Sequence, residues 1–257
     1  MGARVDIQRL AGAAILVGLL LPGCPSLTGA VEKTPAEKAE FHYQLANNSF
    51  YAQDTASAIA DLFKALELDP SHAKAHHLLG FIYFGRRQHG DAAVHFRRAM
   101  ELDPKMYEAR ANLGALFLAQ QRWTEAIEVL TPLAEDQLYP TPHLVQNNLG
   151  FAHLNAGDLE AALKHLQLAV FLKPEMCLAH NNLGRVYLAT GQTELAVRAF
   201  DRATARCADY VEPYFWLGEL YTATGQRDLA RQSYDRCVEL GPETPIGLQC
   251  MEKGGKR

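Results

Sequence analysis

The sequence predicts an all-α protein, a right-handed solenoid of six helix-turn-helix repeats spanning residues 39–242. Three observations carry this prediction. A leucine-glycine motif recurs at a nearly constant period, apolar residues within each copy follow helical spacing, and glycine or proline marks the helix ends. The aromatic content of 9% also favours helices over a sheet.

The period is read from one leucine in each copy. These leucines are Leu45, Leu79, Leu113, Leu149, Leu183 and Leu217, and the steps between them are 34, 34, 36, 34 and 34 residues. A constant step of this length is typical of stacked helix pairs, in which each unit buries its apolar face against its neighbours. Residues 243–257, after the last copy, are expected to form a short cap or a loose tail.

Small residues recur at one position on each predicted helix. Glycine in the middle of a helix costs about 1 kcal/mol relative to alanine, so its repetition indicates that two backbones approach closely there. The first helices carry Gly80, Gly114, Gly150, Gly184 and Gly218, and the second helices carry Ala58, Ala92, Ala126, Ala162, Ala196 and Ala230. Turn glycines, as in residues 190–192, end several first helices, and prolines such as Pro104 end second helices.

The first residues have the layout of an export signal. Arg4 and Arg9 precede an apolar run from residue 10 to 21, which is shorter than the roughly 20 residues of a spanning helix. The following "LPGC" resembles the bacterial lipobox, which implies cleavage after residue 23 and acylation of Cys24. Residues 1–23 are therefore expected to be a lipoprotein signal peptide and residues 24–38 an acylated tether. An ordinary secretory signal with an incidental cysteine is the alternative.

Four further cysteines permit disulfides in an exported chain. Cys177 opens a first helix and Cys207 closes the second helix of the same pair, so antiparallel packing would make them neighbours. Cys237 and Cys250 could tie the C-terminal segment to the last helix. The alternative is four separately buried thiols, because alanine stands at the position of Cys237 in other copies.

Several classes of function are excluded. Twenty-five basic and 29 acidic residues give a net charge of −4 without a basic stripe, so no nucleic-acid partner is expected. The chain lacks the common catalytic, phosphate-binding and zinc motifs. We therefore expect no enzymatic activity, no cofactor, no metal and no small-molecule substrate. His72 and His76 have a spacing that could share a metal, but packing histidines are the preferred interpretation.

The repeats resemble the tetratricopeptide repeat over residues 39–242. With the lipobox and an L-Y-P-x-P insertion at residues 138–142, the chain resembles the pilotins of type IV pilus machines, the PilW/PilF/Tgl group of outer-membrane lipoproteins. This resemblance implies an acylated, periplasm-facing outer-membrane protein that binds secretin subunits and promotes their assembly. Another envelope adaptor, one that scaffolds a cell-wall or outer-membrane assembly complex, is the alternative function.

The first helices supply the candidate partner-binding residues, because they line the concave side of such a solenoid. The aromatic candidates are Tyr43, Phe50, His77, Phe81 and Phe84, and the amide candidates are Asn112, Asn148 and Asn182. Amides at a repeating position can bind the backbone of an extended peptide. For the aromatics the alternative is a core between repeats, and for the asparagines it is hydrogen bonding between helices.

Overall fold

The computed structural model describes residues 33–255, and within this range it contains only α-helices. The helices are α1 (Pro35–Tyr51), α2 (Thr55–Leu68), α3 (Ala73–Gly85), α4 (His89–Leu102), α5 (Tyr107–Ala119), α6 (Trp123–Glu135), α7 (Pro142–Ala156), α8 (Leu159–Leu172), α9 (Cys177–Ala189), α10 (Thr193–Arg206), α11 (Val211–Ala223), α12 (Arg227–Leu240) and α13 (Pro245–Lys253). The all-α prediction is confirmed. The predicted signal peptide and Cys24 lie outside the described residues.

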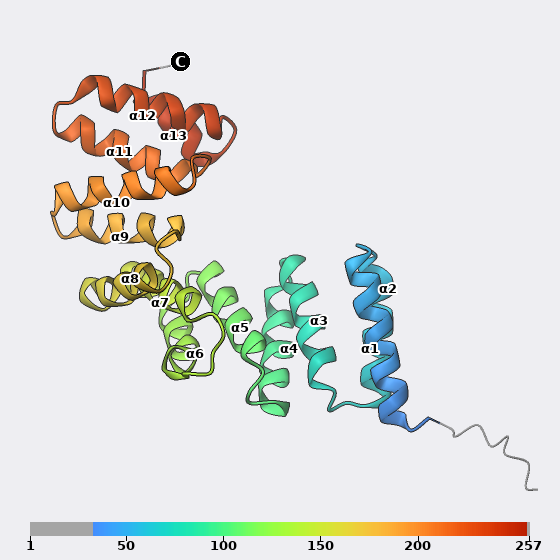
Figure 1. The fold of residues 1–257 in the computed structure, drawn as a ribbon. Coiled ribbons are helices and arrows are strands. Elements are labelled where there is room, and N and C mark those ends of the chain that lie inside the picture. Colours follow the sequence, from blue (N-terminus) through green and yellow to red (C-terminus); the bar gives the residue numbers. More distant parts are fainter. Residues whose placement is uncertain (1–32, 256–257) are drawn as a thin grey trace, which may run out of the picture. The chain divides into compact units, whose positions relative to one another are not determined.

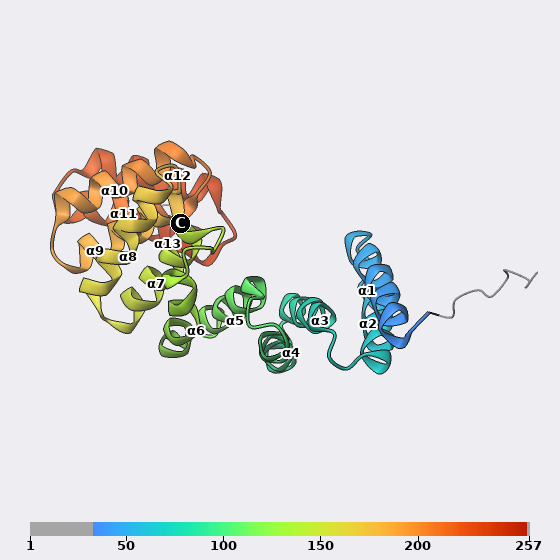
Figure 2. The ribbon, with the colours of Figure 1, turned by 60° about the horizontal axis from the view of Figure 1, so that its bottom comes forward.

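Helices α1 to α12 form six consecutive pairs, one for each copy of the sequence repeat. The two helices of each pair pack against each other, and the ribbon views show this most clearly for α1 with α2 and for α3 with α4 (Figure 1 and Figure 2). Neighbouring first helices also touch, since α1 contacts α3, α3 contacts α5, and α5 contacts α7. A row of first helices therefore runs through the early repeats, and it positions the site described below.

The mid-helix glycines allow each pair to pack closely. A Cβ atom added to Gly184 would lie 2.6 Å from the ring of Phe200, and one added to Gly150 would lie 2.5 Å from Leu166. Phe200 and Leu166 are fully buried. The close approach expected from the recurring glycines is therefore present, with a large side chain of the second helix filling the space that the glycine leaves.

The turn between the two helices of each pair places one residue in the left-handed conformation. In the last three pairs this residue is glycine: Gly157, Gly191 and Gly225 have φ values of 87°, 72° and 77°. In the first three pairs it is Gln53, Arg87 and Gln121, with φ values of 63°, 61° and 60°. The backbone of the turn is thus repeated even where the sequence lacks the glycine that favours it.

Helix α1 begins before residue 39, the predicted start of the repeats. Residues 24–38 were expected to be a tether, but Pro35 to Lys38 already belong to α1, so this boundary is wrong by four residues. Thr34 is the N-cap, its side chain accepts from the backbone N–H of Glu37, and the Glu37 side chain accepts in return. This capping box, with Pro35 in the first turn, starts the helix.

The C-terminal segment ends the solenoid with a short helix. Helix α13 packs on α11 and α12, so of the two possibilities left open for residues 243–257 the described part forms a cap. The structure joins Cys237 to Cys250 and Cys177 to Cys207, with Cα atoms 6.1 and 6.0 Å apart. Each disulfide therefore ties together segments that are already neighbours in the fold.

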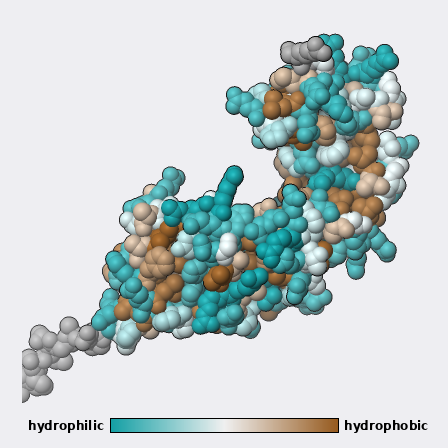
Figure 3. Space-filling view, turned by 180° about the vertical axis from the view of Figure 1, so that it is seen from behind, coloured by the Kyte–Doolittle hydropathy of each residue, from teal (hydrophilic) through white to brown (hydrophobic). Residues whose placement is uncertain are grey.

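None of the helices between residues 33 and 255 is long and apolar enough to cross a membrane. Large exposed hydrophobic side chains are present, such as Phe171 on α8 and Phe63 on α2. On the face seen in Figure 3 the hydrophobic patches are separated by hydrophilic side chains.

Candidate functional site

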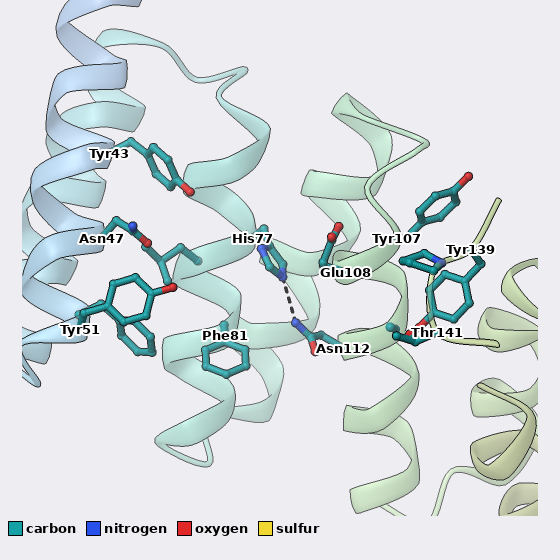
Figure 4. A pocket seen from close by; sticks show the side chains of 14 residues that line it. Tyr43, Asn47, Tyr51, His77, Phe81, Tyr107, Glu108, Asn112, Tyr139 and Thr141 are labelled. Carbon is teal, nitrogen blue, oxygen red and sulfur yellow. Dashed lines mark hydrogen bonds between the residues drawn. The ribbon is translucent and has the colours of Figure 1, made fainter. Parts of the chain in front are cut away.

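A pocket of about 680 Å³ lies on the first helices of the first three pairs. Its volume falls in the range of roughly 300–1,000 Å³ typical of ligand sites. The lining residues come from α1 (Tyr43, Asn47, Phe50, Tyr51), α3 (His77, Leu78, Phe81), α5 (Tyr107, Glu108, Ala111, Asn112) and the loop between α6 and α7 (Tyr139, Pro140, Thr141). In Figure 4 the α1 side chains lie on one side and those of α5 and the loop on the other.

Aromatic rings form the wall made by α1 and α3. The rings of Phe50 and Phe81 meet edge to face, with centroids 5.8 Å apart, and Phe81 remains 41% exposed. Phe50 and Tyr43 also pack against the buried core between the first two pairs. These rings therefore pack against the core and also present an accessible apolar surface, as aromatic residues at binding sites do.

A hydrogen bond between neighbouring repeats forms the floor. Nδ2 of Asn112 lies 2.9 Å from Nε2 of His77 (Figure 4). Burial lowers the pKa of His77, and the nearby charge of Glu108 only partly opposes this effect. The imidazole is therefore neutral at pH 7 and can accept the amide N–H of Asn112.

The loop that contains the two-residue insertion forms the opposite wall. The hydroxyl of Tyr107 donates to Oδ2 of Asp136 at 2.7 Å, and Oδ1 of Asp136 accepts from the backbone N–H of Leu138 at 2.8 Å. The rings of Tyr107 and Tyr139 meet edge to face at 5.7 Å, and Tyr139 is buried. The loop is thereby held against α5, and it closes one side of the pocket.

The structure brings together five of the eight residues expected to contact a partner. Tyr43, Phe50, His77, Phe81 and Asn112 line the pocket, whereas Phe84, Asn148 and Asn182 do not. Phe84 is half-buried and packs against the core of the second and third pairs. For the five residues that line the pocket, contact with a partner stays a prediction.

The position of Asn182 corrects one of these expectations. Its side chain is only 2% exposed, and its Nδ2 donates to Oδ1 of Asn147 at 3.0 Å. Asn112 and His77 stand at the corresponding positions two pairs earlier. Asn148 is half-buried beside Asn147, whose amide lies 3.4 Å from it. Asn182 therefore joins neighbouring repeats instead of facing a partner, which is the alternative that the sequence left open.

Sequence reasoning missed several lining residues, among them Asn47, Tyr51, Tyr107, Glu108 and Tyr139. The L-Y-P-x-P insertion that contains Tyr139 is visible in the sequence, but nothing in its spacing indicates that it folds over α5. The tyrosine of the L-Y-P-x-P element was the available signal.

The chemistry of the pocket is that of binding. Its lining offers aromatic rings, amides and one carboxylate, that of Glu108. Across residues 33–255 no group of three or more metal-ligating side chains is close enough to hold an ion.

The repeat itself is matched along most of the chain. Residues 43–105, 112–176, 147–211 and 181–245 match the tetratricopeptide repeat, and residues 83–138 match a second form of it. The chain belongs to the tetratricopeptide repeat family. Proteins built from this repeat mediate protein–protein interaction, and no catalytic family is indicated for the chain.

Among tetratricopeptide repeat proteins, the chain is similar to pilus proteins. It is 32% identical over 151 residues to the type IV pilus assembly protein PilF of Pseudomonas aeruginosa, an alignment that covers 55% of this chain and 59% of that relative. The chain thus matches somewhat more than half the length of this relative.

Two solved structures share the fold. The crystal structure of PilW, a widely conserved type IV pilus biogenesis factor, matches with a TM-score of 0.72 and 22% identity, over 83% of this chain and 98% of that one. The structure of Pseudomonas aeruginosa PilF matches with a TM-score of 0.71 and 21% identity, over 85% and 99%. At this level of identity these two matches concern the architecture of the repeats.

Proposed function

We propose that this tetratricopeptide repeat protein is a pilotin-like outer-membrane lipoprotein that binds secretin subunits of a type IV pilus machine. In this role it promotes their localisation and assembly into the pilus exit ring, and so supports pilus biogenesis and twitching-type motility. The observation that carries the proposal is the 32% identity to PilF over 151 residues.

The pocket supports a binding role of this kind. It combines exposed aromatic rings with hydrogen-bonding groups from three repeats, and such surfaces recognise extended segments of other proteins. Acylation of Cys24 would hold the repeats at the membrane, because several acyl chains bind far more firmly than one. The tether after Cys24 would leave the pocket free to meet secretin subunits on the periplasmic side.

The first experiment is to measure the heat-resistant secretin multimer in outer-membrane fractions of cells with and without the gene. We expect the multimer to be lost while secretin monomer is still made. An unchanged multimer would contradict the proposal and direct attention to another envelope complex.

Two variants separate the anchor from the pocket. Cys24→Ala should leave a folded periplasmic protein and misplace or reduce the multimer. Phe81→Ser should weaken secretin binding, measured with purified proteins, whereas Phe63→Ser should not, because Phe63 has a similar exposure of 46% on α2 outside the pocket. Equal binding by both phenylalanine variants would exclude the pocket as the contact surface.

A further inference from the structure

We infer that the pocket receives a cationic side chain, that of an arginine in the first place, presented by an extended segment of the protein partner. This inference deepens the proposed function and rests on it for the identity of the partner.

Electron-rich rings surround the space. Six of the lining side chains are tyrosine or phenylalanine, contributed by α1, α3, α5 and the loop between α6 and α7. The faces of such rings attract cations, and arginine is found on them more often than lysine because its planar guanidinium also stacks. A site for an aliphatic side chain alone has no need of rings from four separate segments.

The one formal charge in the lining is negative. Glu108 lies between His77 and Tyr107 (Figure 4), it is exposed, and it has no ion-pair partner among residues 33–255. No lysine or arginine lines the pocket to compete for this carboxylate. A guanidinium placed among the rings could therefore pair with Glu108 in the bidentate geometry that arginine and carboxylates adopt.

The polar groups nearby do not oppose a cation. His77 is neutral, and its Nε2 accepts from Asn112, so the imidazole adds no positive charge. The hydroxyl of Tyr107 donates to Oδ2 of Asp136, which is not a lining residue, so a second carboxylate lies next to that hydroxyl. The local field therefore favours positive charge on the ligand.

Two short, capped, glycine-flanked peptides test the inference, one with a central arginine and one with citrulline, which has nearly the same shape without the charge. Binding is measured at pH 7 by NMR titration of the intact protein. The resonance of the Asn112 side-chain amide reports occupancy of the pocket. We expect the arginine peptide to shift this resonance and the citrulline peptide to bind about tenfold more weakly.

The protein variant is Glu108→Gln, and its matched control is Glu128→Gln, which removes an exposed carboxylate from α6 outside the pocket. Glu108→Gln should weaken the arginine peptide about tenfold and leave the citrulline peptide unchanged, whereas Glu128→Gln should change neither. Equal binding of the two peptides, no binding of either, or an unchanged Glu108→Gln variant would each overturn the inference.

The peptide titration and the measurement of the secretin multimer test different claims. If arginine is not preferred but the secretin multimer still requires the gene, only the chemistry assigned to the pocket is wrong. If arginine is preferred but the multimer is unchanged in cells without the gene, the pocket serves a partner other than the secretin.

Discussion

At the scale of single residues, a missing side chain can matter as much as one that is present. Gly184 leaves the space in which the ring of Phe200 lies, and Phe200 is fully buried, so the ring has no room to move aside. The space left by the missing Cβ of Gly184 fits the ring of Phe200, so a change at either residue affects the packing of both.

Replacing Gly184 with alanine should therefore destabilise the protein. The gain of about 1 kcal/mol in helix propensity is opposed by overpacking, which typically costs about 1–3 kcal/mol and more where nothing can shift. We expect a net loss in the free energy of unfolding, measured by urea denaturation. Gly90→Ala is the control, because nothing lies within 4 Å of a Cβ at Gly90. An equal effect of both variants would show that packing against Phe200 is unimportant.

A pair of half-buried histidines should make stability depend on pH. Nδ1 of His76 lies 2.9 Å from Nδ1 of His95, and burial lowers the pKa of both. Since the unfolded chain takes up protons more readily than the folded one, stability is complete above the ordinary histidine pKa of about 6.5 and is lost as pH falls below it.

The measurement is the free energy of unfolding between about pH 7.5 and pH 5.5, a range that spans the ordinary histidine pKa. We expect a decrease towards low pH, and a smaller decrease in the variant His95→Gln, which removes one titrating group of the pair. A free energy that rises on acidification would contradict the assigned direction of the pKa changes.

The candidate site shows which residues a sequence can reveal. Tyr43, His77 and Phe81 can be predicted because helical periodicity places them on the inner face of the first helices. Tyr139 was not found as a lining residue because its place depends on how an irregular loop folds over α5. The same periodicity did not separate Asn112, which lines the pocket, from Asn182, which is buried between repeats.

At the scale of elements, the turns show a conflict between backbone and sequence. A non-glycine residue in the left-handed conformation costs roughly 1–2 kcal/mol. The early repeats carry this cost at Gln53, Arg87 and Gln121, whereas the later ones have glycine.

Gln121→Gly should accordingly stabilise the protein by about 1 kcal/mol, less the entropy that glycine adds to the unfolded chain. The control is Gln120→Gly, one residue earlier, where φ is −88° and glycine brings no conformational gain. Thermal unfolding of the two variants should move in opposite directions. If Gln121→Gly is destabilised instead, the contacts of the glutamine side chain stabilise the protein by more than its left-handed backbone conformation costs.

The start of α1 shows how an element boundary can be missed. Pro35 looks like a helix breaker inside a polar segment, but proline is favourable in the first turn of a helix, where the backbone N–H has no partner in any case. Thr34 and Glu37 have the spacing of a capping box, which is a start signal that sequence alone contains. The period of the repeat could not reveal it, because it predicts a start at residue 39, whereas α1 has 17 residues and α3, α5, α9 and α11 have 13 each.

At the scale of the whole molecule, the core is a series of small clusters. Leu62, Leu79 and their neighbours pack between the first two pairs, whereas Phe200 and Leu217 belong to a separate cluster further along. In such a chain, stability is approximately a sum of repeat and nearest-neighbour contributions, so a local defect need not spread to the other end. The pocket is lined only by residues of the first three pairs and of the loop that follows them.

A defect in the later repeats should therefore leave the pocket intact. In Gly184→Ala, amide hydrogen exchange should become faster in α9 and α10 and in the helices that touch them, while α1 to α4 keep their protection. The side-chain amide of Asn112 should keep its NMR position, because Asn112 and its hydrogen-bond partner His77 lie two and three pairs before Gly184. Faster exchange along the entire chain would instead reveal a single cooperative unit. In that case, any destabilising change in the later repeats would also weaken the pocket, because local opening and global unfolding would be the same event.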